Sequence, residues 1–322
     1  MERSEVLATD LQSSEPEVRI GLSRAGVRGV SKAIRLRRGP HEKLVFAEIS
    51  CSVDLDPQQR GVHMSRFPEL FEQTVDQLVM DEALLVEELA EHIATAVAAR
   101  QQAVRAEVEV SARYPLQRET PVTRMRTQEM VSLIGIAVSN GAGARRVVGV
   151  EATGINACPC AQDLVRGEAA ERLAAAGFGE DAERILELVP LATHNQRGRG
   201  TLLVGTAQNL DAEDLAGIVE RSMSAPVYEL LKRPDELHVV EQAHRNPRFV
   251  EDSVRVALEE LLSTMPALED GDFVLSRQRN LETIHDHDVV AERWGTVGEI
   301  RAELGGTAPS SEQTTLEAWL RA

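Results

Sequence analysis

The stretch VFAEISCSVDL, residues 45–55, decides the fold because its side chains alternate in kind. Every odd-numbered residue is apolar, from Val45 to Leu55, and the polar side chains at even positions are Glu48, Ser50, Ser52 and Asp54. Successive strand residues point to opposite faces of a sheet, so the alternation predicts a strand with one buried face. Strands of this kind are typical of antiparallel sheets covered on one side.

Strands and helices are expected on both sides of this stretch. Residues 104–112 repeat the alternation and predict a second strand. Between the two strands the apolar spacing predicts two helices, one beginning at Pro68 and one covering about residues 82–100. The other strands expected in this part of the chain are residues 19–38, bent near Gly26 and Gly29, and a hairpin of 130–138 and 146–153 that turns at Asn140-Gly141.

The same order recurs in the second part of the chain. A helix-rich insert precedes a strand, two helices and two closing strands, expected at residues 161–188, 200–207, 211–232 (broken at Pro226), 247–262, 272–279 and 281–290. The doubled pattern predicts an α+β fold with two antiparallel sheet halves in tandem and helices on one face. We place the halves at about residues 15–140 and 141–300 of a single unit spanning 1–322, with 1–14 and 305–322 peripheral.

Composition restricts the function classes. The chain has 322 residues, is 43% hydrophobic and carries a formal net charge of −17. The acidic balance argues against a nucleic-acid partner. No apolar run approaches the roughly 18 residues of a membrane helix, and the polar N-terminus does not resemble a secretory signal, so we expect a cytoplasmic protein without a membrane partner. Three cysteines do not make a disulfide framework.

The cysteine pair Cys158-Pro159-Cys160 lies between an expected strand and an expected helix. Thiolates at a helix start become reactive or bind metals, because the free N–H groups favour negative charge. The Cys-x-Cys spacing does not match zinc ribbons, and no second pair completes a four-cysteine site. By spacing alone, two ordinary loop cysteines remain an equally good interpretation.

Two histidine segments could also carry chemistry. Residues 193–200 combine His194 with two arginines and two glycines, as anion-binding loops do. In residues 284–288, His285 and His287 share one face if the segment is a strand. They could then supply a metal ligand and an acid–base group. Read singly, the first segment also fits a solvated turn and the second a charged strand end.

Two carboxylates and one loop complete the candidates. Glu236 is expected just past a helix end, and Glu251 in the first turn of the next helix. Each also fits an ordinary surface carboxylate. Residues 60–69 join a strand to a helix start, where backbone N–H groups and Arg66 could hold a phosphate. That loop is equally suited to capping the helix.

Taken in order, these segments resemble the GTP cyclohydrolase family that includes the bacterial type IB enzyme and the archaeal MptA enzyme. The resemblance extends from about Asp10 to Thr296. It is carried by Gly-Val-His-Met-Ser-Arg-Phe (61–67), Cys-Pro-Cys-Ala-Gln (158–162), His-Asn-Gln-Arg (194–197), Leu-Lys-Arg-Pro-Asp-Glu (231–236), Asn-Pro-Arg-Phe-Val-Glu-Asp (246–252) and Ile-His-Asp-His (284–287). It implies the tunnelling fold, in tandem within one chain, and a homo-oligomer (dimer or tetramer) around a central barrel.

The resemblance also implies roles for individual residues. The metal ligands would be Cys158, His194, Glu236 and His285, a donor set suited to Fe²⁺, with Zn²⁺ and Mn²⁺ as alternatives. The catalytic residues would be Cys158, Cys160, Glu251 and His287. Glu251 would anchor the guanine edge, and the other substrate contacts would be His63, Arg66 and Arg197. Which of the two cysteines binds the metal is left open.

The reaction implied is the opening of the guanine imidazole ring of GTP at C8, with release of formate and formation of a 7,8-dihydroneopterin phosphate. Ala161-Gln162 and residues 199–202 resemble MptA, which uses Fe²⁺ and yields the 2′,3′-cyclic phosphate. The alternative is the type IB product, dihydroneopterin triphosphate. Two other classes are a non-catalytic metal or nucleotide binder, for which a site residue should be missing, and a thiol redox protein, which the Cys-x-Cys spacing disfavours.

Overall fold

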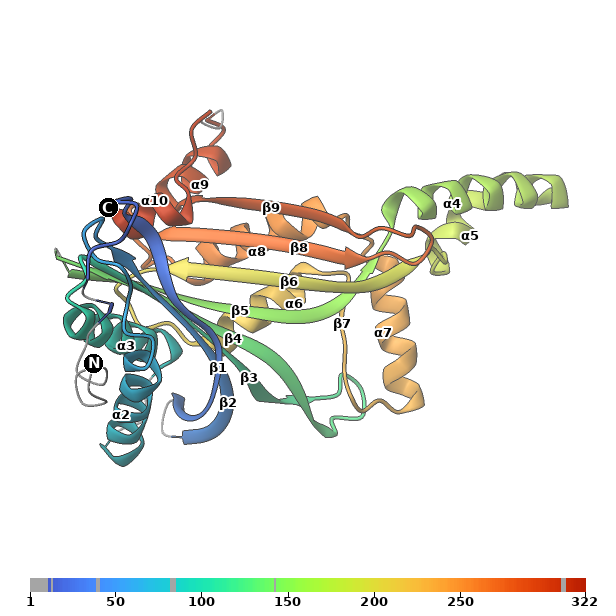
Figure 1. Ribbon diagram of the computed structural model, residues 1–322. Coiled ribbons are helices and arrows are strands. Elements are labelled where there is room, and N and C mark those ends of the chain that lie inside the picture. The colour runs from blue at the N-terminus through green and yellow to red at the C-terminus, as the bar shows by residue number, and fades with distance from the viewer. Residues whose placement is uncertain (1–10, 13, 39–40, 82–84, 142, 308–310) are drawn as a thin grey trace.

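The computed structural model describes residues 11–12, 14–38, 41–81, 85–141, 143–307 and 311–322. Its centre is one antiparallel sheet with the strand order β1-β2-β3-β4-β5-β6-β8-β9 (Figure 1). The strands are β1 Leu22–Arg38, β2 His41–Leu55, β3 Arg105–Glu119, β4 Arg126–Asn140, β5 Gly143–Ala157, β6 Asn195–Gly205, β8 Phe273–Leu281 and β9 Val289–Thr296. The two-residue strand β7, Ala225–Pro226, pairs with β5.

Helices occur between the strands and after the last strand. They are α2 Arg66–Asp81, α3 Val86–Gln101, α4 Pro159–Leu173, the short η1 Ala174–Phe178, α5 Ala182–Leu188, α6 Ala212–Ser222, α7 Arg233–Arg245, α8 Val250–Thr264, α9 Val297–Leu304 and α10 Leu316–Arg321. Two strands, helices and two strands therefore occur twice, which confirms the α+β fold with a doubled arrangement. None of the helices in the described ranges combines the length and apolarity needed to cross a membrane.

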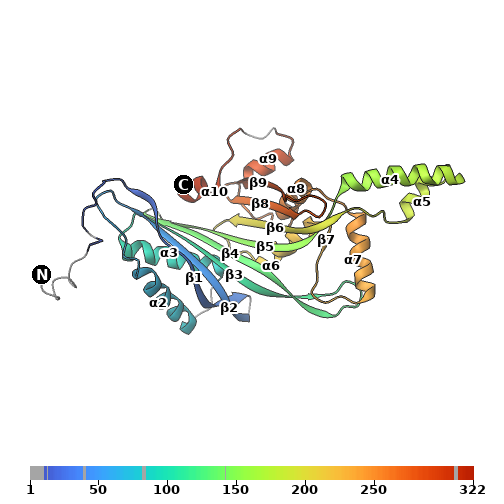
Figure 2. The same cartoon turned by 45° about the vertical axis from the view of Figure 1, so that its right-hand side comes forward.

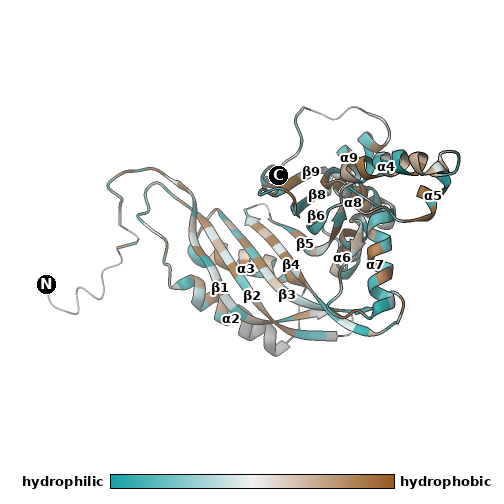
Figure 3. Cartoon of the chain, turned by 90° about the vertical axis from the view of Figure 1, so that its right-hand side faces the viewer, coloured by the Kyte–Doolittle hydropathy of each residue, from teal (hydrophilic) through white to brown (hydrophobic). Residues whose placement is uncertain are grey.

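The core lies between one face of the sheet and helices α3, α6 and α8. The alternation in residues 45–55 is confirmed, since Val45, Ile49 and Val53 of β2 are at most 5% exposed. Figure 3 shows brown and teal residues alternating along β1, β2 and β3. Burying one aliphatic side chain of this size contributes about 1.5–3 kcal/mol, so this face of the sheet holds the helices in place.

Three local predictions are corrected by the structure. Helix α2 begins at Arg66, two residues before Pro68. Helix α6 ends at Ser222, before Pro226, because the chain there becomes strand β7. Helix α7 is not among the predicted helices; it begins at Arg233, directly after the stretch expected to be helical, and Pro234 lies in its first turn, where proline is favoured. The bend expected in residues 19–38 is confirmed by two register shifts between β1 and β2.

Two elements lie outside the main layer of helices. The hairpin of α4 and α5 projects away from the sheet (Figure 2). Helix α10 packs on the sheet face opposite α3, with Trp319 only 7% exposed and its ring centroid 6.0 Å from that of Phe273. A side chain at Gly205 would meet the Trp319 ring at 2.7 Å, so this contact requires glycine.

Candidate active site

The candidate residues lie at two ends of the sheet, which we name by strand β5. At the proximal end β5 begins at Gly143, beside Asn140 of β4, which in turn pairs with Arg105 of β3. At the distal end β5 finishes at Ala157, beside Asn195 of β6. A strand rises about 3.3 Å per residue, so the length of β5 separates the two ends by about 45 Å.

The Cys-Pro-Cys loop starts helix α4 at the distal end, as the sequence predicts. Cys158 is the N-cap residue, and Pro159 is the first residue of the helix. The Cys158 Sγ accepts a hydrogen bond from the Ala161 N–H at 3.5 Å, and the Cys158 N–H donates to the His194 carbonyl at 3.1 Å. The Cys158 sulfur therefore faces the free N–H groups of the helix start, which favour negative charge. Cys160 is exposed.

His194 lies directly before β6, and the hydrogen bond just described holds its backbone beside Cys158. Its side chain is 15% exposed, yet the Nδ1 atom is buried and has no hydrogen-bond partner among the described residues. The Glu282 Oε2 lies 3.8 Å away, too far for a hydrogen bond, and the Glu282 side chain is only 6% exposed. A buried carboxylate therefore lies beside an imidazole whose Nδ1 atom makes no hydrogen bond to the described residues.

Glu282 is a site residue that the sequence reasoning missed. It follows the last residue of β8 and precedes the His-Asp-His run by two residues. The prediction for this loop rested on its histidines and did not include the glutamate at its start. Its position before a pair of possible metal ligands was a signal that could have found it, because carboxylates commonly hydrogen-bond to metal-binding imidazoles.

The strand expected for His285 and His287 is wrong. Residues 282–288 form an irregular loop between β8 and β9, because strand pairing stops at Leu281 and resumes at Val289. The two imidazoles still lie together, with ring centroids 5.2 Å apart and planes 15° apart. The Thr283 hydroxyl donates to the carbonyl of Asn195 at 3.2 Å, which fastens this loop beside His194.

Arg197 and Glu251 also belong to the distal end. Arg197 is the third residue of β6 and is exposed, whereas Gln196 next to it is buried toward the helices. Glu251 lies in the first turn of α8, as the sequence predicts. The start of α8 is tied to the end of β5, because the buried Asn156 side-chain N–H₂ donates to the Ser253 hydroxyl at 3.1 Å.

Glu236 lies in the first turn of α7 and not past a helix end, so that prediction is wrong. The start of this helix is fixed by Asp235, whose carboxylate accepts hydrogen bonds from the Thr123 hydroxyl at 2.6 Å and from the Val122 N–H at 2.9 Å. Burial alone would raise the pKa of Asp235, but these hydrogen bonds hold it well below its usual range. Glu236 therefore stands beside the β3–β4 turn.

His63 and Arg66 lie at the proximal end, away from the cysteine loop. The Gln101 side chain at the end of α3 donates to the His63 carbonyl at 3.2 Å, and Gln101 closely precedes the start of β3. Arg66 is the first residue of α2, and its N–H donates to the same carbonyl at 3.0 Å. His63 and Arg66 are therefore separated from the proposed metal ligands by most of the sheet within one chain, whereas Arg197 lies at the same end as those ligands.

The donor types at the distal end fit a transition-metal ion in part. A thiol, imidazoles and carboxylates are ligands that Fe²⁺, Zn²⁺ and Mn²⁺ accept. The unpartnered Nδ1 of His194 also shows that the protein alone does not satisfy this ring. In the described part of the chain, however, no three His, Cys, Asp or Glu side chains come close enough to hold a metal ion together. To bind a metal ion together, these side chains would have to move closer to one another.

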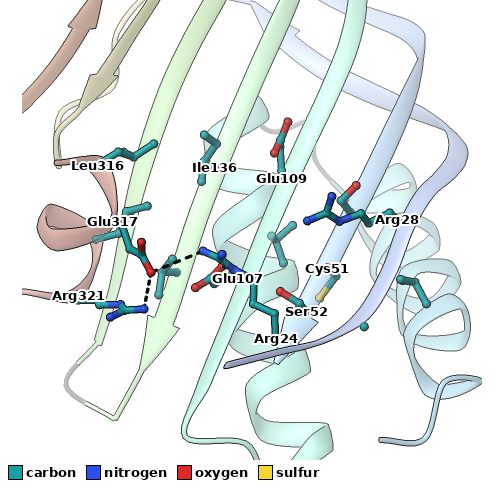
Figure 4. A pocket seen from close by; sticks show the side chains of 16 residues that line it. Arg24, Arg28, Cys51, Ser52, Glu107, Glu109, Ile136, Leu316, Glu317 and Arg321 are labelled. Atoms are coloured by element: carbon teal, nitrogen blue, oxygen red, sulfur yellow. Dashed lines mark hydrogen bonds and ion pairs between the residues drawn. The ribbon is translucent and has the colours of Figure 1, made fainter. Parts of the chain in front are cut away.

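A cavity of about 720 Å³ lies elsewhere, on the sheet face that carries α10 (Figure 4). Most of the charged residues that line it form ion pairs. Arg24 pairs with Glu107 at 2.5 Å and lies 4.0 Å from Glu317, and Glu317 also pairs with Arg321. None of the residues that the sequence singled out for metal or substrate binding lines it. This cavity therefore does not serve as the candidate active site.

Comparison with known proteins gives the family. The family model for "Type I GTP cyclohydrolase folE2" matches residues 8–291. The chain is 39% identical over 305 residues to GTP cyclohydrolase MptA of Methanococcus aeolicus, covering 92% of this chain and 99% of that protein. It is 39% identical over 303 residues to the Methanothermobacter thermautotrophicus MptA, covering 92% and 95%, and 37% identical over 307 residues to the Methanosarcina acetivorans MptA, covering 92% and 96%.

Solved structures share the fold at low sequence identity. Uricase from Arthrobacter globiformis superposes with a TM-score of 0.50 at 8% identity, covering 87% of this chain and 96% of that chain. A hyper-thermostable mutant of the same uricase gives a TM-score of 0.52, covering 86% and 92%. These matches confirm the tandem tunnelling fold that the sequence implied. With the family model matching most of the length, the chain belongs to the type I GTP cyclohydrolase folE2 family.

Proposed function

We propose that this protein is a metal-dependent GTP cyclohydrolase that opens the guanine imidazole ring at C8 and releases formate. The product we favour is 7,8-dihydroneopterin 2′,3′-cyclic phosphate, and the alternative is the triphosphate of the type IB enzyme. The observation that carries the proposal is the gathering of Cys158, His194 and the His285 loop at one sheet end, in a chain 39% identical to proteins named GTP cyclohydrolase MptA.

A bound divalent ion, which we propose to be Fe²⁺, would supply a hydroxide at neutral pH, because such ions lower the pKa of bound water. Cys158, His194, Glu236 and His285 are the residues that would hold it. The Glu282 carboxylate is close enough to His194 that a small movement would let it accept a hydrogen bond from the Nδ1–H group. That would leave Nε2 of the same ring as the nitrogen that binds the ion.

The remaining residues of the distal end bind guanine and move protons. Ring opening at C8 needs a proton at N7, and the exposed thiol of Cys160 and the imidazole of His287 are suited to supply or remove it. The Glu251 carboxylate can accept two hydrogen bonds, from guanine N1–H and from the 2-amino group. Glu251 would then hold the purine from the first turn of α8, and Asn156 of β5 anchors that turn through its hydrogen bond to Ser253.

The site is completed by a second copy of the chain. His63 and Arg66, two of the proposed substrate contacts, lie at the proximal end, and β5 alone spans about 45 Å between that end and the cysteine loop of the same chain, farther than one nucleotide reaches. A homo-oligomer that places the proximal end of one copy against the distal end of another brings the two sets together. Three exposed apolar side chains in distal-end elements support such contact: Leu237 (61%), Val240 (54%) and Ile284 (61%).

The product of GTP turnover tests this proposal. Protein purified without oxygen and loaded with Fe²⁺ is expected to release formate from GTP. Phosphorus NMR of the pterin should show a five-membered cyclic phosphate together with free pyrophosphate. A triphosphate spectrum instead would establish the type IB product. Unchanged GTP after loading with Fe²⁺, Mn²⁺ or Zn²⁺ in turn would contradict the proposed activity.

A further inference from the structure

A second cavity, of about 350 Å³, lies between the two halves of the chain, on the helix-covered face of the sheet. It is enclosed by the first residues of α3, the loop before α6 and the strands β1, β3 and β4. Most of its wall is apolar and is formed by Leu36, Leu85, Val86, Leu133 and Leu210. The volume is within the roughly 300–1,000 Å³ of small-molecule sites.

Glu87 is a polar residue of this wall with an unsatisfied side-chain oxygen. The residue is 2% exposed, and its Oε1 atom has no hydrogen-bond partner among the described residues. Burial raises its pKa to about 7, and Glu88 and Glu91 add to the rise. A hydrogen bond from its own backbone N–H and the charge of Arg146 offset this rise only in part. An ionised carboxylate buried with one oxygen unsatisfied is costly, so a chain that keeps one beside a cavity has a group available for a ligand.

The positive charge nearest to Glu87 is already used by other groups. Arg146 bonds the Glu91 carboxylate at 3.2 Å, the Asn209 side-chain oxygen at 2.7 Å and the Ala207 carbonyl at 3.0 Å. Asp211 and Glu213 at the start of α6 line the same cavity. The acidic groups around Glu87 are Glu88, Glu91, Asp211 and Glu213, and Arg146 is the cation that acts on it among the described residues. These surroundings therefore carry excess negative charge.

Close packing keeps this cavity in a fixed shape. The start of α3 rests on β4 at Gly135, where a side chain would meet the Val86 carbonyl oxygen at 2.4 Å. The Asn209 side chain donates to the Glu88 carboxylate at 3.1 Å and joins the loop before α6 to α3. The cavity thus lies where the two halves meet, and none of the active-site candidates lines it.

We propose that this cavity binds a small organic cation, an amine or amidine with an apolar body, whose nitrogen donates to the Oε1 atom of Glu87. An amidine fits best, because its planar pair of N–H donors matches a carboxylate. The apolar body replaces water against the leucine wall. The ligand contacts both halves, so its binding stabilises the folded chain by mass action.

Benzamidine is the probe that tests this site. At pH 8 it should bind by calorimetry with a dissociation constant on the order of 10⁻⁴–10⁻³ M and raise the melting temperature. Benzamide, which has the same shape without the charge, should bind at least about tenfold more weakly. Because benzamidine needs the ionised carboxylate, its affinity should fall as the pH is lowered through about 7, the pKa of Glu87.

Two substitutions and one control decide the location. Glu87→Gln keeps the shape and should weaken benzamidine binding at least about tenfold. Ala212→Leu fills the cavity from α6 without changing charge, and should do the same. Glu259→Gln, an exposed carboxylate on α8, should leave the affinity unchanged. Absence of saturable binding to the full-length protein, or equal binding to all variants, would overturn the proposal.

Discussion

Replacing His194 or His285 by Asn is expected to remove the bound metal and to lower formate release from GTP by more than about 100-fold. Loss of a partner that merely orients a metal-binding imidazole commonly costs 10- to 100-fold, and loss of the ligand itself should cost more. His194 stands beside Cys158 through a backbone hydrogen bond of 3.1 Å, and its Nδ1 atom is unpartnered. Metal content by mass spectrometry and formate release are the two measurements.

The control for this prediction is His244→Asn. His244 lies in the last turn of α7, where its ring contacts the Val240 carbonyl of its own helix at 2.8 Å. The substitution removes one histidine but leaves the candidate metal ligands unchanged. Metal content and the rate of formate release should therefore remain near those of the wild type. Full metal occupancy in both the His194 and His285 variants would refute the ligand assignment.

Replacing Glu251 by Gln should lower kcat/KM for GTP by about 10²- to 10⁴-fold. The carboxylate is proposed to accept two hydrogen bonds from guanine, and bonds to a charged group contribute about 1.5–3 kcal/mol each. Glutamine keeps the size but presents an N–H₂ group toward one of the guanine donors. The wild type should prefer GTP over inosine triphosphate, which lacks the 2-amino group. The variant should lose most of that preference.

Glu259→Gln is the matched control, because Glu259 is an exposed carboxylate on the same helix. Its kinetics with both nucleotides should equal those of the wild type. If Glu251→Gln lowers the rate but preserves the full preference for GTP, Glu251 acts in proton transfer and does not read the guanine edge.

Much of the fold could be predicted because local patterns survive in the tertiary structure. The two-residue alternation of residues 45–55 places Ile49 and its neighbours in the core, and the structure buries them. Proline was the weaker guide. Pro226, where a break in the helix was expected, lies in a strand after the helix has ended, and Pro234 lies in the first turn of a helix that was not predicted. A proline indicates that a helix begins or ends nearby, but it does not show whether the helix precedes or follows it.

The candidate site could be predicted in part. Cys158 and His194 are far apart in the sequence, and a backbone hydrogen bond joins them in the structure. The resemblance implies both as metal ligands, and that role stays a prediction. The loop of His285 was mistaken for a strand because alternating residues also occur in loops. Glu282 and Glu87 were not singled out, because a lone glutamate is usually solvated and only the tertiary structure shows that these two are enclosed.

Each active site is proposed to combine the distal end of one copy with the proximal end of another, and mixed oligomers test this arrangement directly. One chain carries His194→Asn and the other carries His63→Ala with Arg66→Ala, each with its own affinity tag. Each variant alone should be nearly inactive in releasing formate from GTP. Mixed dimers purified through both tags should regain up to about half of the wild-type rate, because one of their two sites is free of substitutions. Mixed dimers as inactive as the separate variants would contradict a shared site.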